Sequence, residues 1–531
     1  MICSSKERWI GPALMGLCAL LYLAFAGNYG LWDPWETHYG EVARQMVERR
    51  DYVSLHYPCS PLEGVNFWSK PVLTFWLMAP FIRLFGLQSA TPIPGELVDS
   101  WRIEWALRMP SLFLALGGIW GVFVLLRRLV GVRAATLGAL VLATSPTWIL
   151  IARQAMTDMP FVVPMTIALA LAGLALLPPN NLTDESVLPR LSLGRLSWPH
   201  TRAFYVLVVL VIIAAVAQLA VISVQLKGTF AWRGQRYAVP GIAIMTPYWL
   251  GLALGMWWTT RATTRRSLYL LLAWLCCAIA TLAKGPAGLA LPGLVIVLYL
   301  GTSGRWRELF TGLELPRGAI LFVVVAFPWY HAMLVRHGLP FWRELIGDNY
   351  VNRAAGRRGD RGTFEYYLEW MLYGTFPWSG IVAASVLRAM RAKANGSPRE
   401  RLARFALCWL VVDYVVLTLV RTKFHHYLLP MLPPLALCAG VALDELCDHA
   451  SERRFEMLLI AVPTTLLCGL DLAALPQRVL WLFNYDYVNM PEVGRAWPAG
   501  ERYEYGHLLM AFAIIATFGT ALLARGRRAH A

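Results

Sequence analysis

Long apolar runs recur along this chain, and they constrain the fold more than any other feature of the sequence. They extend from about residue 10 to about residue 524, and each is close to the roughly 20 residues that an α-helix needs to cross a bilayer. Hydrophobic residues make up 57% of the chain and charged residues only 15%, which is too apolar for an ordinary soluble fold. The sequence therefore predicts an all-α polytopic membrane protein with about 12–14 transmembrane helices.

The net charge of +16 could indicate nucleic-acid binding, but the Lys and Arg residues form short clusters between the apolar runs. This distribution is typical of the positive-inside rule, by which cytoplasmic loops of membrane proteins collect basic residues. We therefore predict membrane lipids and no nucleic acid as partners. The nine cysteines have no spacing that indicates a disulfide or zinc framework.

The positive-inside rule also orients the chain. Lys6 and Arg8 precede the first apolar run, about 9–29, which we expect to remain as a membrane helix rather than to be removed as a signal peptide. The first outer loop then covers about 30–104. It contains a short apolar piece at 71–87, which we interpret as a juxtamembrane helix.

Further outer segments follow because each membrane span carries the chain to the opposite side of the membrane. They are ARQAMTDMP at 152–160, a hairpin with its turn at Arg233 and Gly234, AKGPAG from Ala283, a long lid-like loop at about 336–375, and RTKFHHY at 421–427. Lys227, Arg233 and Arg236 of the hairpin violate the positive-inside rule. We divide the chain into a catalytic module at 1–446 and a C-terminal extension at 447–531, with an outer segment at about 476–505.

This alternation places scattered polar residues in one compartment. Charged side chains at membrane depth are costly and mark a path or a site. Here the charged residues stand at the ends of the runs, which favours a reaction chamber at the membrane surface over a conduction path.

The chain resembles the polyprenyl-phosphate-sugar-dependent glycosyltransferases of the glycosyltransferase-C superfold, such as the aminoarabinose transferases of lipid A and the protein O-mannosyltransferases. The resemblance runs in order from Trp32 to about Leu437. The matching stretches are LWDPWETHYGEVARQM, NFWSKPVLTFWL, RMPSLF, ARQAMTDMP, AKGPAGLALPG, FPWY, FEYYLEWMLYGTFPWS and TKFHHYLLPMLPPLAL.

The resemblance implies a polyprenyl phosphate sugar as donor and a lipid, glycan or protein hydroxyl as acceptor. It also implies an active site that faces the periplasm or exterior of a bacterial inner (plasma) membrane. Two departures from the family pattern matter. The family has an Asp-Glu pair where this chain has Trp35 and Glu36, and Glu-Lys where it has Ser69 and Lys70. The second departure removes a carboxylate ligand, so no metal site is predicted and a divalent metal cofactor is doubtful.

Sugar transfer needs a carboxylate base, cations for the leaving phosphate and a fixed geometry. We predict Asp33 or Glu36 as the base and Asp158 as a group that orients the acceptor or sugar. Plain helix capping explains these acids equally simply, because Asp33, Pro34 and Glu36 form a capping-box pattern and Asp158 precedes Met159 and Pro160.

The predicted phosphate-binding cations are Lys70, Lys284, Lys423 and Arg353. The predicted substrate-binding residues are Trp35, Tyr39, Arg153, Tyr350 and His425. The alternatives are lysines that extend to lipid headgroups and a solvated basic loop. Two other functions compete: a transporter or lipid flippase, which should show two similar halves and polar mid-helix residues, and a non-catalytic scaffold.

Overall fold

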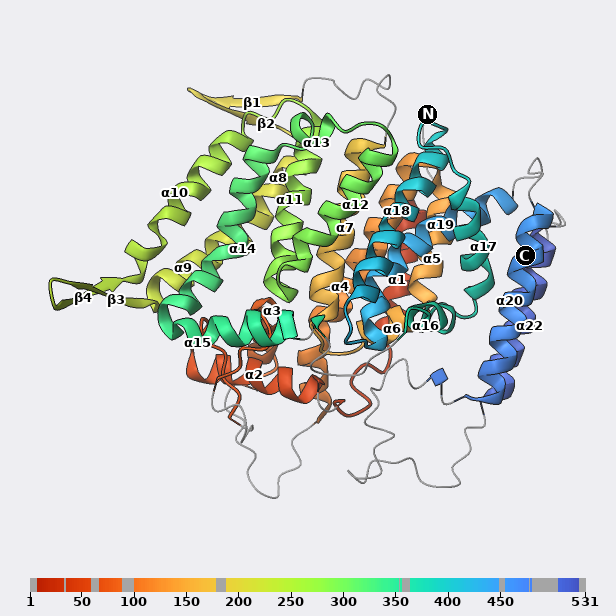
Figure 1. The fold of residues 1–531 in the computed structure, drawn as a ribbon, viewed down its shortest axis with the longest axis horizontal. Coiled ribbons are helices and arrows are strands. Elements are labelled where there is room, and N and C mark those ends of the chain that lie inside the picture. The colour runs from red at the N-terminus through yellow and green to blue at the C-terminus, as the bar shows by residue number, and fades with distance from the viewer. Residues whose placement is uncertain are drawn as a thin grey trace. The chain divides into compact units, whose positions relative to one another are not determined.

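The computed structural model describes residues 7–32, 35–58, 66–87, 100–177, 188–352, 354–355, 363–447, 454–476, 478–479 and 505–524. It is predominantly helical (Figure 1). The chain forms two compact units, each assembled from separate stretches. Unit 1 comprises Met1–Ala24, Ala115–Arg153 and Arg353–Ala531, and unit 2 comprises Phe25–Leu114 and Gln154–Asn352.

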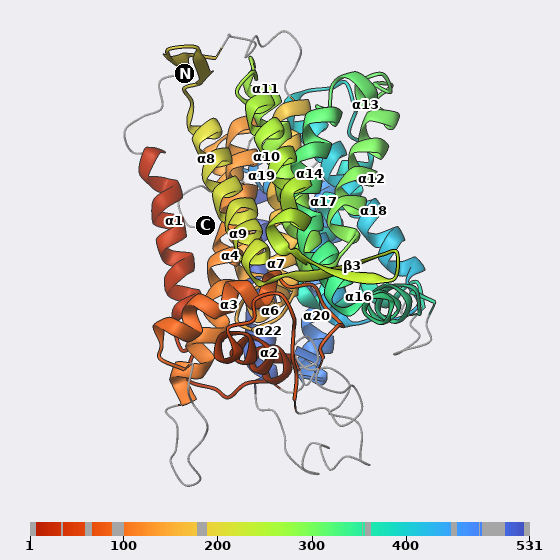
Figure 2. The same cartoon turned by 90° about the vertical axis from the view of Figure 1, so that its left-hand side faces the viewer.

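Unit 2 holds most of the first loop and the middle of the chain. Its helices are α2 (Trp35–Arg49), α3 (Leu73–Leu84), the first half of α4 (Ser100–Leu129), α7 (Asp158–Leu176), α8 (Arg202–Val211), η1 (Ile212–Val216), α9 (Ala217–Gln225), α10 (Gly241–Thr259), α11 (Arg265–Lys284), α12 (Ala287–Thr302), α13 (Glu308–Thr311), α14 (Leu315–His337), α15 (Leu339–Trp342) and η2 (Arg343–Asn352). Within this unit α2, α3 and α15 lie at one end of the long helices (Figure 1), and Figure 2 shows α2 and α3 at that end from the side.

Helix α7 forms the centre of unit 2. It is apolar around its whole circumference and almost every residue is buried, as expected for a helix packed on all sides. It packs extensively along α11, whose end at Lys284 lies beside the start of α7 at Asp158, so the two helices are antiparallel. This pairing brings two predicted site residues to the same end of the unit.

Two hairpins complete unit 2. Strands β1 (Arg190–Leu193) and β2 (Leu196–Pro199) form one, which the sequence did not predict, at the end opposite α2 (Figure 1). Strands β3 (Lys227–Trp232) and β4 (Gln235–Pro240) form the other. Its turn residues Arg233 and Gly234 have φ of 49° and 81°, as a two-residue type I′ turn requires. The predicted hairpin turn is therefore confirmed.

Unit 1 comprises the N-terminal helix and the last third of the chain. Its elements are α1 (Glu7–Leu23), the second half of α4, α5 (Val132–Thr144), α6 (Pro146–Ala152), α16 (Tyr366–Gly374), α17 (Ser379–Met390), α18 (Pro398–Leu419), η3 (His425–Met431), α19 (Leu432–Leu446), α20 (Arg454–Ala474) and α22 (Gly506–Ala524). The run expected to be one span at about 134–151 is a pair of helices bent by 64°. The bend lies at Ser145, whose ψ of 124° is extended because Pro146 disfavours a helical conformation before it.

The chain is a helical integral membrane protein, as predicted. Among the described residues eight helices are long and apolar enough to cross a membrane, or nine if the bent pair counts as one span. Four further apolar helices are shorter, at Leu73–Leu84, Ala287–Thr302, Ser379–Met390 and Gly506–Leu522. Within the described part of the chain, full-length spans are thus fewer than the 12–14 expected, because several apolar runs there form helices shorter than a bilayer crossing. The first of the short helices, α3, falls within the apolar piece at 71–87, and its placement beside the membrane stays a prediction.

Candidate active site

A buried ion pair fixes the start of α2. The Arg108 guanidinium on α4 donates from Nε to Glu36 Oε1 at 2.8 Å and from Nη2 to Oε2 at 2.7 Å, and both side chains are fully buried. Arg108 also donates to three carbonyl oxygens of the preceding segment, those of Ala26, Tyr29 and Gly30, at 2.6–2.9 Å. This clamp holds the chain just before the predicted base.

Backbone groups complete the surroundings of Glu36. The amide of Ala155 donates to Oε1 at 2.8 Å, and the amide of Trp32 donates to Oε2 at 2.9 Å. Together with Arg108, four donors occupy the roughly four acceptor sites of a carboxylate. Glu36 is thereby a structural anchor between the first loop and the segment before α7, and it has no acceptor site left for a substrate proton.

A second ion pair joins α7 to α11. Lys284 Nζ lies 2.6 Å from Asp158 Oδ1, and the Asp158 side chain is almost fully buried. The N-cap residue of α7 is Thr157, so Asp158 is the first helical residue and not its cap. An acid at a helix start and a lysine at a helix end are each favoured by the helix dipole. Both predicted residues therefore meet at the same end of unit 2.

The glycine after Lys284 brings a third predicted residue to this pair. Gly285 has a φ of +77°, a conformation that favours glycine. A Cβ atom added there would stand 2.2 Å from Tyr350 Oη, so the η2 tyrosine lies directly against this turn. Asp158, Lys284 and Tyr350 are thus gathered from three separate elements.

The other predicted residues of unit 2 have different surroundings. Tyr39 is buried in the core, with its ring centroid 6.2 Å from Phe67 and 6.1 Å from Phe75, so its ring supports packing. Trp35 is half-buried and packs on Tyr39. Lys70 is half-buried just before α3. Asp33 and Arg353 lie outside the described residues.

Three predicted residues belong to unit 1. Arg153 Nη2 donates to the Ala24 carbonyl at 2.6 Å. Buried Lys423 donates to the carbonyls of Thr418 and Val420 at 2.7 and 3.0 Å, which caps the end of α18. His425 lies 2.5 Å from Tyr366 Oη through Nδ1, and its ring lies 3.8 Å from that of Trp370. Lys423 and His425 thus have structural partners in unit 1.

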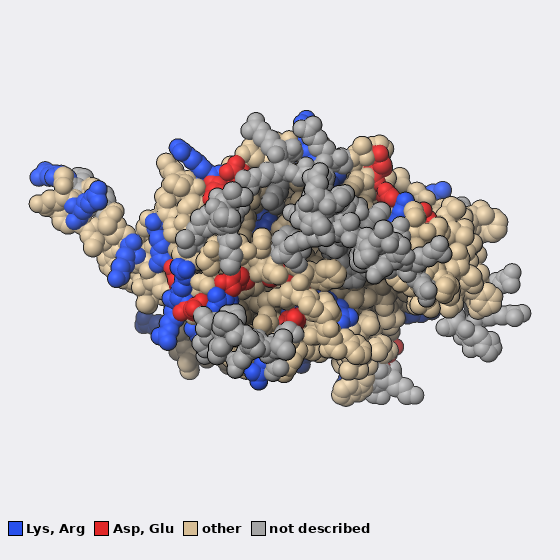
Figure 3. Space-filling model, turned by 90° about the horizontal axis from the view of Figure 1, so that it is seen from below, with Lys and Arg blue, Asp and Glu red and all other residues tan. Residues whose placement is uncertain are grey.

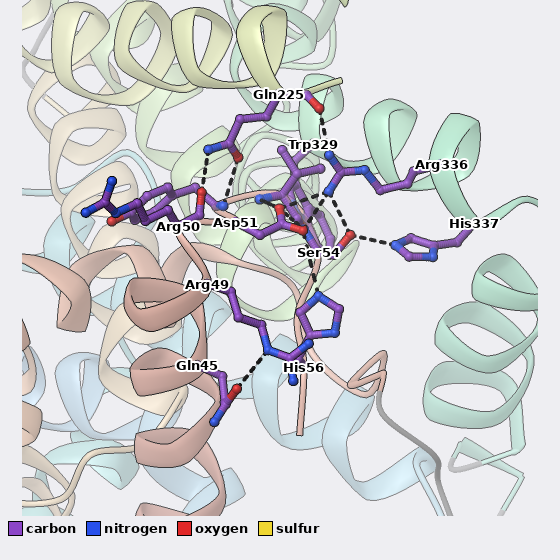
Figure 4. Close-up of polar contacts among 12 residues, drawn as sticks. Gln45, Arg49, Arg50, Asp51, Ser54, His56, Gln225, Trp329, Arg336 and His337 are labelled. Atoms are coloured by element: carbon purple, nitrogen blue, oxygen red, sulfur yellow. Dashed lines mark hydrogen bonds and ion pairs between the residues drawn. The ribbon is translucent and has the colours of Figure 1, made fainter. Parts of the chain in front are cut away.

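A polar cluster that the sequence did not predict orders residues 50–56 of the first loop (Figure 4). Arg336 Nη1 lies 2.9 Å from both carboxylate oxygens of Asp51 and from Ser54 Oγ. Ser54 Oγ is also 2.7 Å from His337 Nε2. We call this group the loop latch: Asp51, Ser54, His56, Arg336 and His337.

The latch holds Asp51 ionised. Burial raises the pKa of this carboxyl, but contacts with His56, the backbone amides of Ser54 and Val53, and Arg336 outweigh burial, so its pKa is well below the usual range. In the sequence, Arg336 and His337 stand at the end of an apolar run. From the sequence we placed both in the long loop at about 336–375 and did not predict the cluster.

The described residues contain no group of three or more His, Cys, Asp or Glu side chains that could hold a metal ion. Asp158 is paired with Lys284. A lysine such as Lys284 is a compact positive charge that suits a leaving phosphate.

The helical membrane fold, with short helices in its first loop, is similar to that of a solved bacterial protein. The solved ArnT from Cupriavidus metallidurans bound to undecaprenyl phosphate superimposes on 99% of this chain and 73% of its own, with a TM-score of 0.62 and 22% identity. Residues 96–185 match the dolichyl-phosphate-mannose-protein mannosyltransferase family.

Sequence comparison points the same way. The undecaprenyl phosphate-alpha-4-amino-4-deoxy-L-arabinose arabinosyl transferase of Pseudomonas aeruginosa (strain UCBPP-PA14) is 24% identical over 447 residues, which are 83% of this chain and 60% of that protein. The enzyme of the same name from Edwardsiella ictaluri is 22% identical over 96% of this chain and 72% of its own. This chain thus spans about 60% of the length of the first of these relatives. The resemblance predicted from the sequence motifs is confirmed.

Proposed function

We propose that this protein is a membrane glycosyltransferase that moves a sugar from a polyprenyl phosphate donor to an acceptor hydroxyl, with inversion at the anomeric carbon. The observation that carries the proposal is the meeting of Asp158, Lys284 and Tyr350 at the ends of α7 and α11 in a fold shared with ArnT. The relatives' names give an undecaprenyl-linked aminoarabinose as the first donor to test.

The reaction is a single displacement. The acceptor oxygen forms a bond to the anomeric carbon while the bond from that carbon to the phosphate oxygen breaks, and the phosphate keeps the bonding electrons. The acceptor proton passes to a carboxylate, which contributes about 10² to 10⁴-fold in rate. Because polyprenyl phosphate leaves as an anion, nearby cations stabilise the developing charge and no acid is needed.

Asp33 is the proposed base. Glu36 has all its acceptor sites occupied, whereas Asp33 directly follows Trp32, whose amide is fixed by Glu36. The Arg108 clamp therefore acts as a positioning device for the segment that carries the base. Such preorganisation is what keeps a base and substrate at reacting distance.

Lys284 and Lys70 are the proposed phosphate cations, and Asp158 holds Lys284 in place through its 2.6 Å contact. Tyr350, beside Gly285, is proposed to contact the donor. The lid-like loop expected at about 336–375, with Arg353 as a phosphate-binding residue, stays a prediction.

The site is proposed to face the periplasm or exterior of a bacterial inner membrane. Short helices α2, α3 and α15 gather at the same end of unit 2 as Asp158 and Lys284, which supports a site at the membrane surface (Figure 1). The acceptor is a hydroxyl on a lipid, glycan or protein.

The test replaces the three acids one at a time, as Asp33→Asn, Glu36→Gln and Asp158→Asn, in membranes supplied with labelled polyprenyl phosphate aminoarabinose. We expect Asp33→Asn to reduce transfer by roughly 10²-fold or more with expression intact. A helix-capping residue would instead cost about 1 kcal/mol of stability and leave turnover near normal. Normal transfer by all three variants would remove the proposal.

A further inference from the structure

The hairpin β3–β4 carries charge that the proposed reaction does not use. Residues 227–240 contain three basic residues and no acidic residue, and Lys227, Arg233 and Arg236 are all exposed. None of the three forms a salt bridge with any residue that the structure describes. From below unit 2, the arm at the left of Figure 3 shows blue groups and no red ones.

The strand register sorts the residues of the hairpin into two sets. The pairs Lys227 with Pro240, Thr229 with Ala238, and Ala231 with Arg236 occupy one set of alternating positions. The other set holds the pairs Gly228 with Val239, Phe230 with Tyr237, and Trp232 with Gln235. Since directly opposed residues share a face, Lys227 and Arg236 lie on one face of the hairpin, and Tyr237 and Val239 lie on the other. This division is typical of elements that lie in a membrane interface.

Little of the protein supports the hairpin beyond its root. At the root, a Cβ atom added to Gly228 would stand 2.8 Å from a methyl group of Ile244, so this part is closely packed. From Thr229 to Ala238 every residue with a described side chain is exposed, and Tyr237 is 48% exposed. An isolated two-stranded ribbon is marginally stable in water, which indicates that this one rests on another surface.

The hairpin begins where a candidate membrane span ends, on the side of the membrane that the sequence predicts to be outside. It directly follows the apolar stretch Arg202–Gln225, which is long enough to cross a membrane. Arg336 of the loop latch donates to the Gln225 carbonyl at 2.7 Å, and Gln225 in turn bonds the backbone of Arg50 and Tyr52. The hairpin therefore leaves unit 2 at the same end as the first outer loop.

We propose that β3–β4 is a surface anchor that binds the phosphate groups of anionic phospholipids on the membrane face of the candidate site. Charge complementarity selects this partner, because three cations that form no salt bridge with a described residue stand where a membrane-spanning stretch ends. It also explains why these cations break the positive-inside rule: they have a local anionic partner. A basic cluster of this kind is attracted to anionic lipid and is screened by salt.

The experiment measures backbone amide hydrogen exchange of residues 227–240 in the full-length protein, reconstituted in nanodiscs of phosphatidylcholine alone or with phosphatidylglycerol. In the anionic nanodiscs we expect exchange to slow by about fivefold or more, the contribution of a single cation near an anionic surface. The effect should diminish in high salt.

Two variants decide between charge and other causes. A triple glutamine variant should abolish the difference in hydrogen exchange between the two lipid compositions. It combines Lys227→Gln, Arg233→Gln and Arg236→Gln. The matched variant Arg233→Lys with Arg236→Lys keeps the charge and should retain it. Equal exchange in both lipids would overturn the proposal, and so would a difference that persists in the triple glutamine variant, since the hairpin would then be covered by something other than anionic lipid.

Discussion

At the residue scale, the Arg108 clamp is the most consequential contact that the sequence did not reveal. Arg108 lies in the RMPSLF stretch that carries part of the family resemblance, but its partner Glu36 is 72 residues away. Pairings across such separations leave no periodic pattern in the sequence. The clamp explains why an acid beside the predicted base is buried rather than exposed to substrate.

Replacing Arg108 by Met should leave the Glu36 carboxylate buried without its partner. We expect a loss of about 3–5 kcal/mol in the free energy of unfolding, because an uncompensated buried charge is strongly destabilising. The combined Glu36→Gln and Arg108→Met variant should be less destabilised than Arg108→Met alone. Thermal unfolding in detergent measures both. The control is Arg102→Met on the same helix, an exposed site where about 0.5 kcal/mol or less is expected.

The Asp158–Lys284 pair can be separated into structural and catalytic roles. Lys284→Met should lower the transfer rate by roughly 10²-fold, the effect of removing one group that stabilises developing negative charge. If the pair were only structural, adding Asp158→Asn to Lys284→Met would restore stability and activity together. We expect the double variant to recover stability and remain inactive.

Sequence reading named Glu36, Asp158, Lys284 and Tyr350, and the last three do come together. It assigned Tyr39 to substrate, where the structure places it in the core. The pattern was available, because Tyr39, Val42, Ala43 and Met46 follow the i, i+3, i+4, i+7 spacing of a buried helix face and all four are buried. Tyr39 was predicted to bind substrate because it lies beside Asp33 and Glu36, although its spacing along the helix favoured packing.

At the element scale, the turn between α11 and α12 depends on Gly285. Gly285→Ala would force a side chain into a positive-φ position and against Tyr350. We expect a cost of about 1–3 kcal/mol and a raised KM for the donor, since Tyr350 must move. The matched control is Gly293→Ala in α12, where an added Cβ meets nothing within 4 Å. That change should stabilise the protein by about 0.5–1 kcal/mol.

The loop latch should respond to acid in a defined direction. The folded-state pKa of Asp51 is below its unfolded value, so its contribution to stability is complete above about pH 4 and is lost as the pH falls below that value. Asp51→Asn should therefore expose residues 50–56 to hydrogen exchange at pH 7. The difference from the native protein should shrink on acidification below pH 4. A difference that is constant with pH would show that the Asp51 charge does not hold the latch.

The elements also show what local sequence signals can supply. The hairpin turn at Arg233 and Gly234 could be predicted because the residues that form the turn and its two strands are close together in the sequence. The bend between α5 and α6 was missed although Pro146 marks it, because the apolar residues on both sides of the short stretch 144–147 add up to the length of one span. Apolar composition alone does not distinguish a straight span from a bent pair.

At the scale of the whole molecule, the orientation of unit 2 is directly testable. Hairpins β1–β2 and β3–β4 lie at opposite ends of that unit (Figure 1). Single cysteines placed at Gly194 and at Gly234, both exposed turn positions, should react with a membrane-impermeant maleimide from opposite sides of the membrane. Gly234→Cys should be labelled from outside in intact cells and Gly194→Cys only after lysis. Labelling of both from the same side would contradict the proposed topology.

The overall fold class could be predicted because it follows from summed hydrophobicity, whereas the number of full-length spans could not. Runs such as Ala287–Thr302 and Ser379–Met390 are largely apolar but form helices of only 16 and 12 residues. The division at residue 446 stays a prediction. The two observed units are each built from distant stretches, so no single point along the chain separates them.

The central claim is that this protein transfers a sugar rather than moving a lipid across the membrane. The most direct measurement follows labelled polyprenyl phosphate aminoarabinose in proteoliposomes that contain the protein and a membrane extract as acceptor. We predict release of one polyprenyl phosphate for each sugar transferred, with the anomeric configuration inverted, and loss of both in Asp33→Asn. Intact donor that crosses the bilayer without releasing polyprenyl phosphate would contradict the account.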